Sequence, residues 1–305
     1  MRDIGRRVSL DGLRHTDGKA IKEPVRISDG YLPAAFEGRA ATWSRAAGRV
    51  PSLLWIDRRY AKALRLPSER GPAGARDFLI SLGAEVAARL QPLRSTSFNR
   101  ETVQHFRAES APEHQARSAD ERGYIRFVRG DHQSMAVHAV VRDIARAAQT
   151  ERCRRGRALV RSLHDSWERL YAEHASIRAY AADRTLISRG RIPATWIADA
   201  ASVAWMDNEL GQPCPPCELV VRTPEYLAAI GDEPAVFASV VDEKQAAWSA
   251  VEALGIAARP RAKHLVAQLV ELQRRDLAKP SDSNFEHATF IYAALSSMCP
   301  QRGSV

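Results

Sequence analysis

Two cysteines separated by two residues, Cys214 and Cys217, form the local motif best suited to chemistry. Thiols at this spacing can form a redox disulfide or supply half of a zinc site. A thioredoxin-like pair stands at the start of a helix that follows a buried strand, whereas here Pro215 and Pro216 precede the strand-like run 219–221. Zinc would need two further ligands at a suitable spacing, and the sequence contains no second such pair. The spacing therefore favours a rigid turn, with Cys214 and Cys217 kept as the metal or redox candidates.

A cluster of arginines is the strongest basic feature of the chain. Its members are Arg152, Arg154, Arg155, Arg157 and Arg161. They fall on a segment whose apolar residues repeat at helical spacing, so we expect the arginines on its solvent face. Such a face can hold the phosphates of an anionic partner or can simply be solvated. The net charge of +9 is large enough to bind an anionic partner, but most arginines of the chain alternate with Asp and Glu, which favours the solvated face.

Other catalytic patterns are missing from the sequence. It has no His-Glu-x-x-His metal helix, no Gly-x-Ser-x-Gly elbow, and neither a phosphate-binding Gly-x-x-x-x-Gly-Lys loop nor a Gly-x-Gly-x-x-Gly turn. Asp207 and Glu209 could act as paired carboxylates, but within the run 206–211 they are typical of a polar turn. We therefore predict no catalytic residue, no cofactor and no enzymatic activity.

The elements that carry these residues form two predicted regions with a connection between them. Residues 1–94 form a small α+β domain, with strands near 24–27 and 52–57, a helix through 60–66, and a second apolar stripe through 78–90 that is broken or bent around Gly83. Residues 95–130 are poor in apolar side chains and are expected to form an exposed connection.

The second region, residues 131–305, is predicted to be helix-rich. Helical stripes run through 137–148 and 153–174, which suit an antiparallel hairpin, and short strands are expected around 196–223. Further helices are predicted at 246–254, 262–274 and 284–298, the last opened by a capping box at 283–286. The fold class is thus α+β and predominantly helical. Four tryptophans are expected in cores: Trp55, Trp167, Trp196 and Trp205.

The compartment follows from composition. No run of about eighteen apolar residues is present, and the basic start lacks the apolar stretch of a signal peptide, so a cytoplasmic protein without membrane contact is expected. Four scattered cysteines agree with a reducing compartment.

Several segments together resemble large bacterial proteins that have a sacsin N-terminal ATP-binding-like region. The segments are 51–61 (PSLLWIDRRYA), 77–85 (DFLISLGAE), 201–208 (ASVAWMDN), 215–224 (PPCELVVRTP) and 288–295 (ATFIYAAL). In that family an HSP90-type ATPase domain precedes these segments, and none of its ATP-binding motifs is found in this chain. The resemblance implies a downstream, non-ATPase region of a chaperone-like protein.

Together these observations predict a non-catalytic scaffold or interaction region of a sacsin-like, HSP90-type ATPase protein. Its expected partner is a protein, either the ATPase domain or its client. The alternative is a basic protein that associates with nucleic acid through the five arginines.

Overall fold

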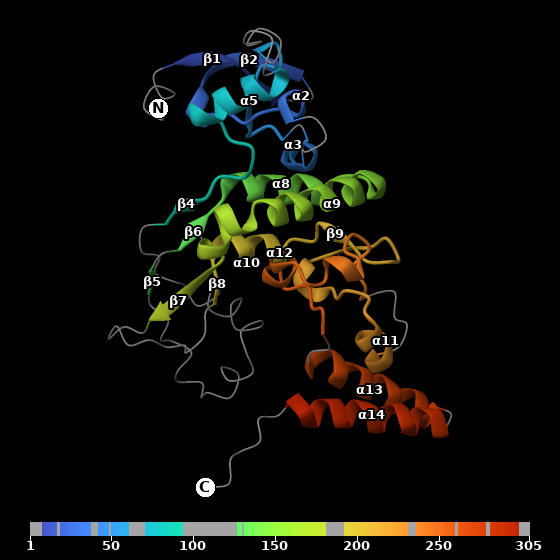
Figure 1. Cartoon of the computed structure of the whole chain (residues 1–305). Helices are drawn as coiled ribbons and strands as arrows, with labels where there is room; N and C mark the ends of the chain where they lie inside the picture. The colour runs from blue at the N-terminus through green and yellow to red at the C-terminus, as the bar shows by residue number, and fades with distance from the viewer. Residues whose placement is uncertain are drawn as a thin grey trace.

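The structure is a computed structural model that describes residues 8–16, 19–37, 42–48, 50–60, 71–93, 127–129, 131–180, 192–230, 236–259, 262–278 and 281–298. Within these residues the fold is α+β and rich in helix, as predicted, and its strands pair antiparallel in small sheets. The N-terminal unit and the C-terminal helices lie at opposite ends of the molecule, and two long helices, α8 (Met135–Ala145) and α9 (Gln149–Asp165), cross its middle (Figure 1).

The N-terminal unit is built on a three-stranded sheet in the order β2-β1-β3. The strands are β1 (Ser9–Thr16), β2 (Lys19–Arg26) and β3 (Leu54–Ile56). Around them lie η1 (Ile27–Asp29), α2 (Ala34–Glu37), α3 (Thr42–Ala47) and α5 (Gly71–Ser81). Both predicted strands are confirmed. A compact cluster of buried apolar side chains, from Val25 to Ala84, holds the sheet against α2 and α5.

Of the two alternatives predicted for the stripe through 78–90, the structure has the break at Gly83, because α5 ends at Ser81. Gly83 adopts a φ of 103°, a left-handed conformation that stops a helix. Its N–H donates to the carbonyl of Ile80, and the next amide, of Ala84, donates to Leu79. The chain turns there and is not helical from residue 84 to residue 90. The helix predicted through 60–66 falls largely on residues 61–70, which lie outside the described residues.

Helices α8 and α9 form the predicted hairpin. Ser134 caps α8 by accepting a hydrogen bond from the amide of Val137 at 3.2 Å. After Asp165 the chain continues through a π turn, η4 (Trp167–Tyr171), and a short 3-10 turn, η5 (Ala172–His174). Two small sheets flank this pair. They contain β4 (Gln91–Pro92) with β6 (His132–Gln133), and β5 (Phe127–Arg129), β7 (Ser176–Tyr180) and β8 (Ile192–Pro193).

The segment that begins at Trp196 is predicted to be extended, but its first part is a helix, α10 (Thr195–Ser202). The carboxylate of Asp131 accepts hydrogen bonds from the amide and the hydroxyl of Thr195, at 2.9 and 2.6 Å. This cap comes from 64 residues upstream, so local sequence could not signal it. Short strands do follow, as the antiparallel pair β9 (Met206–Asp207) and β10 (Pro213–Cys214).

The C-terminal part is helical. It contains η6 (Pro216–Glu218), α11 (Pro224–Ile230), η7 (Glu243–Gln245), α12 (Ser249–Ala253), α13 (Ala262–Ala278) and α14 (Asp282–Met298). The three predicted helices are confirmed, although α12 is shorter than expected. α14 starts before the predicted capping box, since the carbonyl of Ser281 already accepts the amides of Asn284 and Phe285.

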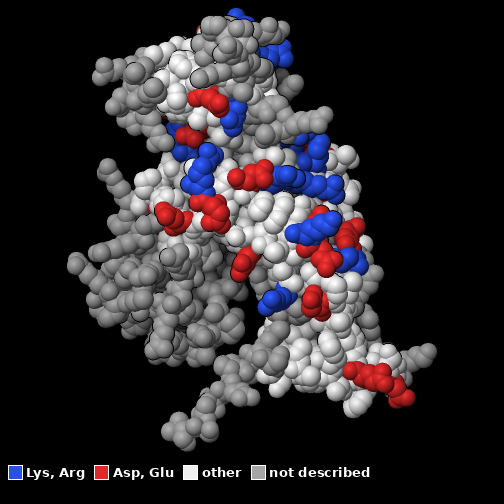
Figure 2. Space-filling model, in the orientation of Figure 1, with Lys and Arg blue, Asp and Glu red and all other residues white. Residues whose placement is uncertain are grey.

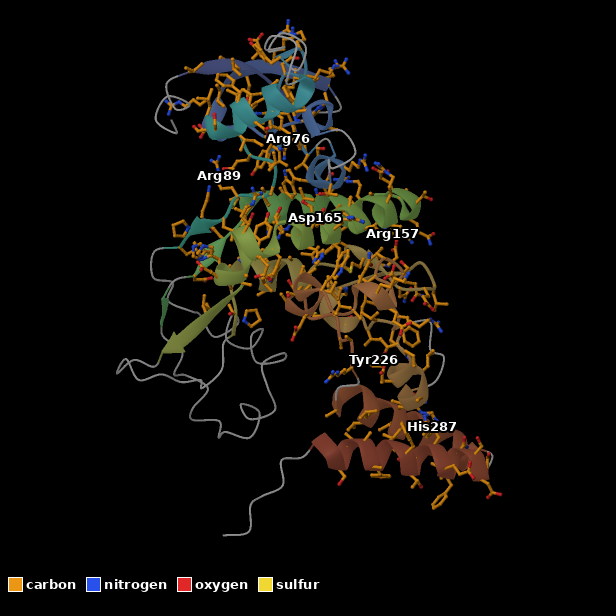
Figure 3. All side chains as sticks on the ribbon, in the orientation of Figure 1. Arg76, Arg89, Arg157, Asp165, Tyr226 and His287 are labelled. Carbon is orange, nitrogen blue, oxygen red and sulfur yellow. The ribbon has the colours of Figure 1, made fainter. Side chains whose placement is uncertain are left out.

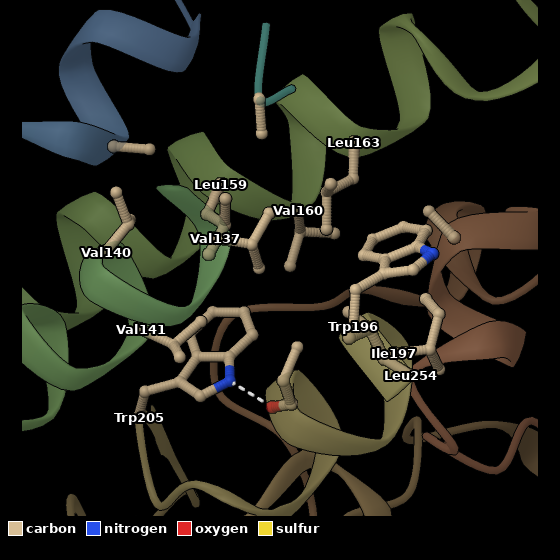
Figure 4. Packing of buried hydrophobic residues seen from close by; sticks show 14 of the residues in the cluster. Val137, Val140, Val141, Leu159, Val160, Leu163, Trp196, Ile197, Trp205 and Leu254 are labelled. Carbon is tan, nitrogen blue, oxygen red and sulfur yellow. Dashed lines mark hydrogen bonds between the residues drawn. The ribbon is translucent and has the colours of Figure 1, made fainter. Parts of the chain in front are cut away.

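The largest hydrophobic core surrounds α8, α9 and α10 and draws residues from Tyr31 to Ile256 (Figure 4). The four tryptophans predicted in cores are buried, and the indole N–H of Trp205 donates to the carbonyl of Ala200 at 2.7 Å. This cluster joins residues on both sides of the predicted connection 95–130, most of which lies outside the described residues; the division into domains stays a prediction.

Candidate interaction surfaces

The five clustered arginines lie on α9 but separate into two groups. The prediction that they share a solvent face is wrong for Arg152 and Arg155, which are 9% and 6% exposed. Arg155 donates to the carbonyl of Ala46 at 2.8 Å and to the Asp143 carboxylate at 2.6 Å. It therefore anchors α9 to α3 and α8, and it is unavailable to an external anion.

Arg154, Arg157 and Arg161 form the exposed group, at spacings of three and four that put them on one face of the helix. Arg154 pairs with Glu151 at 2.6 Å, and Arg161 lies 3.8 Å from Asp165. The third, Arg157, donates to the carbonyl of Ser239 at 3.1 Å (Figure 3). Acidic and basic side chains are interspersed in the middle of the molecule, at the level of α9 (Figures 1 and 2). The face is a charge-mixed one, with its cations partly engaged by the chain itself.

A buried polar network, which the sequence did not reveal, accounts for Arg152. Its Nε donates to Oδ1 of Asp207 at 2.6 Å, and its Nη1 donates to the carbonyl of Ala147. The other carboxylate oxygen of Asp207, which is 0% exposed, accepts from the thiol of Cys153 at 3.0 Å. Burial and the hydrogen bond to Asp207 raise the pKa of Cys153. The network ties α9 to β9 and keeps the Cys153 thiol protonated.

The polar turn predicted at 206–211 is present, but its two acidic residues do different work. Asp207 points into the network just described, whereas Glu209 forms a salt bridge with Arg222. The side-chain oxygen of Asn208, which lies between them, accepts a hydrogen bond from the amide of Gln212, and Gly211 has a φ of 78°. The two carboxylates are each committed to a different arginine, so the geometry does not make them an acid and base pair.

The Cys214 to Cys217 motif lies in a turn, as predicted. Cys214 ends β10 and Cys217 lies in η6, and in the described part of the chain neither forms a disulfide. Burial, together with the charges of Glu218 and Asp207, raises the pKa of Cys214, which lowers its thiolate fraction at neutral pH. Over the described ranges, no group of three or more His, Cys, Asp and Glu side chains is arranged to hold a metal ion.

A pair of buried tyrosines joins the N-terminal unit to the central helices. Tyr31 lies between Trp43 and Trp55, with ring centroids 5.7 Å from each. Tyr171, on the π turn, donates its hydroxyl to the carbonyl of Ala88 at 3.0 Å. Burial raises the pKa of both phenols, that of Tyr171 strongly. These hydroxyls act as structural hydrogen-bonding groups at neutral pH.

The hairpin of α13 and α14 has an inner apolar seam that packs against other residues of the same chain. Its members are Leu265, Leu269 and Leu272 on α13, and Ala288, Ile291 and Leu295 on α14. They pack on Tyr226 and Ala229 of α11, and the His287 ring lies 3.0 Å from the carbonyl of Ala229 (Figure 3). One face of the hairpin is therefore fixed to the rest of the protein.

A second seam on the same two helices is exposed, and we call it the outer seam. It consists of Val266, Val270, Gln273 and Leu277 on α13, and Phe285, Thr289, Tyr292 and Ser296 on α14. Leu277, Phe285 and Tyr292 are 81%, 75% and 64% exposed. Each helix repeats at intervals of four, three and four residues, the heptad spacing of packed helices. Sequence reasoning missed this seam, although its signal is an apolar repeat displaced by one residue from the inner seam.

The two halves of the outer seam face the same way. Six of the eight outer residues follow an inner residue by one position, which is a rotation of about 100° around the helix, and Leu277 and Phe285 continue the two outer rows at heptad spacing. Because α13 and α14 run antiparallel, the same rotation turns both halves toward one side of the hairpin. Among the side chains of the hairpin that the structure describes, those visible in Figure 2 are mostly uncharged apart from an acidic cluster. The outer seam is thus a continuous and largely apolar helical surface.

Two adjoining cavities lie beside α11, one against α14 and the other against α12. Their volumes are about 540 and 650 Å³, and both are lined by Glu225 and Arg259. Small side chains, mostly alanines, form much of the remaining walls, with Phe290 at one end. These cavities provide a shallow, mixed-charge recess beside the hairpin.

Comparison of the chain with family models, curated proteins and solved structures found no match. In the described part of the chain, no helix has the length and apolar character needed to cross a membrane.

Proposed function

We propose that the chain is a non-catalytic protein-interaction module whose principal docking element is the outer seam of α13 and α14. The observation that carries this proposal is the exposure of Leu277 on α13 and of Phe285 and Tyr292 on α14, each of which belongs to a row at heptad spacing along its own helix. Exposing large apolar side chains in a contiguous array is unfavourable in water, and such arrays commonly mark binding surfaces.

The polar side chains around Asp207 also support a binding role, because they are paired with one another. Arg152, Asp207 and Cys153 satisfy one another in the interior, and Glu209 is paired with Arg222. These polar groups are occupied in holding elements together. The sequence resemblance suggests an HSP90-type ATPase domain or its client as the partner. Such a partner would supply an apolar surface that covers the outer seam.

The test is affinity capture by the full tagged chain, with nuclease present and absent, followed by mass spectrometry. The discriminating variants are Leu277→Glu and Tyr292→Glu, which place a charge in the outer seam. Leu210→Glu is the matched control, because Leu210 is also exposed (57%) but lies on the turn between β9 and β10. We expect the seam variants, and not the control, to lose the recovered proteins, among them an HSP90-type ATPase.

Nucleic-acid binding is the second candidate, since Arg154, Arg157 and Arg161 share an exposed helix face. Recovery that disappears with nuclease, and that depends on these arginines instead of the outer seam, would favour it. Recovery that is unchanged in the seam variants would contradict the interaction-module proposal.

A further inference from the structure

We infer that the occupant of the outer seam is a second copy of this chain, packed antiparallel so that two α13–α14 hairpins form a four-helix bundle. This inference rests on the proposed function, because it uses the same surface. It names a second copy as the occupant of the outer seam, in place of the ATPase domain or client that the sequence resemblance suggests. Three observations on the hairpin support it: the extent of the seam, the pattern of large and small residues along it, and the distribution of charge.

The extent of the seam suits a partner made of two helices. Heptad spacing on both α13 and α14 means that each helix offers holes into which a facing helix can insert. The large apolar residues are between about half and four-fifths exposed, from Val266 at 49% to Leu277 at 81%. Together they offer on the order of 600 Å² per copy, which approaches the roughly 800 Å² per partner of a stable interface. A second hairpin presents the required pair of antiparallel helices at the same separation.

The residue pattern favours self-pairing. When α14 is laid antiparallel on its copy about the midpoint of the seam, Phe285 faces Ser296 of the other copy, and Tyr292 faces Thr289. Each aromatic ring then meets a small side chain. This alternation of large and small residues lets facing layers interdigitate without voids or overlap.

The same rotation pairs α13 with its copy. Leu277 then faces Val266 of the second copy, and Val270 faces Gln273. One axis perpendicular to the helices generates both pairings, because each seam is centred near the middle of its helix and α13 and α14 are equally long. A single two-fold operation therefore fills both halves of the surface, as an isologous dimer requires.

The charge distribution permits this contact. None of the eight outer-seam residues is charged, so self-association brings no like charges together at the centre of the interface. The basic Arg274 and the acidic Asp282 and Glu286 are exposed on the hairpin outside the seam. Charges at the rim of such an interface remain hydrated, so they do not oppose its formation.

The test is sedimentation equilibrium of the full chain, with Leu277→Glu and Val266→Lys as separate variants and then as an equimolar mixture. We expect the unmodified chain to dimerise and each variant to dissociate with an affinity about tenfold or more weaker. In the mixture, the glutamate introduced in one chain would face the lysine introduced in the other, while the second contact stays apolar. The mixture should therefore regain a dimer. Circular dichroism checks that each variant is folded, and Leu210→Glu should dimerise normally.

The outcomes separate this inference from the proposed function. A chain that stays monomeric at every accessible concentration, while seam variants still lose a captured protein, overturns the second copy and leaves the interaction module standing. A monomeric chain whose capture is indifferent to the seam variants overturns both. Variants that dissociate singly but fail to reassociate when mixed overturn the antiparallel pairing.

Discussion

The molecule contains two antiparallel helical hairpins, α8–α9 and α13–α14, that have similar sequence periodicity and different surroundings. Around α8 and α9 the chain packs α3, α10, α12 and β9, so apolar side chains such as Val140 and Leu159 are 0% exposed. In the described part of the chain, α11 is the helix packed against the inner seam of α13 and α14, and the outer seam stays in solvent. The comparison teaches that heptad spacing identifies a helix face that packs against another helix. It does not show whether that other helix belongs to the same chain.

The largest effect is expected in the central hairpin, at its buried ion pair. Asp207→Ala would leave the Arg152 guanidinium buried without its carboxylate and should lower the free energy of unfolding by about 3–5 kcal/mol. Urea denaturation followed by circular dichroism measures this loss. Asp165→Ala, which removes the exposed partner of Arg161, is the control and should change stability by about 0.5 kcal/mol or less. Similar losses in both variants would show that the buried network does not hold α9 to β9.

A direct contrast between the hairpins comes from one matched pair of substitutions. Leu159→Ala leaves a cavity in the central core and should cost about 2–5 kcal/mol. Leu277→Ala removes a side chain that is 81% exposed and should cost about 0.5 kcal/mol or less when the chain is monomeric. Urea titrations at low protein concentration measure both. A large loss for Leu277→Ala under these conditions would mean that the outer seam is filled within one chain.

The central core should also make the protein sensitive to alkaline pH. Burial raises the pKa of Cys153 and of Tyr171 above their ordinary values of 9.0 and 10.0. Because the folded state holds these protons more tightly, the stabilisation is present below the ordinary pKa values and is lost as pH rises above them. Tyr171→Phe should flatten the decline in stability above pH 10, as measured by urea denaturation at a series of pH values. If stability declined as steeply with pH in Tyr171→Phe as in the unmodified protein, the Tyr171 phenol would not be the group responsible.

Only a small effect on stability is expected for each residue on the exposed face of α9. Replacing Arg154, Arg157 and Arg161 together by Ala should change the free energy of unfolding by about 1 kcal/mol or less. If this face holds a nucleic acid, the same variant should bind a DNA duplex more weakly, with a salt dependence reduced by about three phosphate contacts in fluorescence anisotropy. Identical binding curves for both proteins would exclude these arginines as the contact.

The sequence is informative wherever the signal is local. Apolar spacing locates α8, α9, α13 and α14, and the buried run at β3 is recognisable from its residues alone. Tryptophan burial follows from the same periodicity, since Trp167 continues the stripe of α9. These features depend on neighbours within a few turns of the chain, which a single sequence displays.

Features set by distant residues are not predictable in this way. The start of α10 depends on Asp131, and the fate of Arg152 depends on Asp207, which is 55 residues away. Considered locally, both positions look solvent-facing or extended. The prediction that places the whole arginine cluster on the surface fails for this reason, because two of its members are interior. Interior placement of a guanidinium becomes recognisable only when its buried carboxylate is known.

The span of the central core bears on how the protein is made. The apolar cluster of the N-terminal unit uses residues 25–84, whereas the central core that includes Tyr31 and Trp55 is complete only when Ile256 is in place. At typical synthesis rates of about 5–20 residues per second, the early part of the chain waits roughly 10–35 seconds for its last core partners. Until then the aromatic side chains around Tyr31 lack their core partners and are exposed. This is the interval in which binding by a ribosome-associated chaperone would protect the chain most.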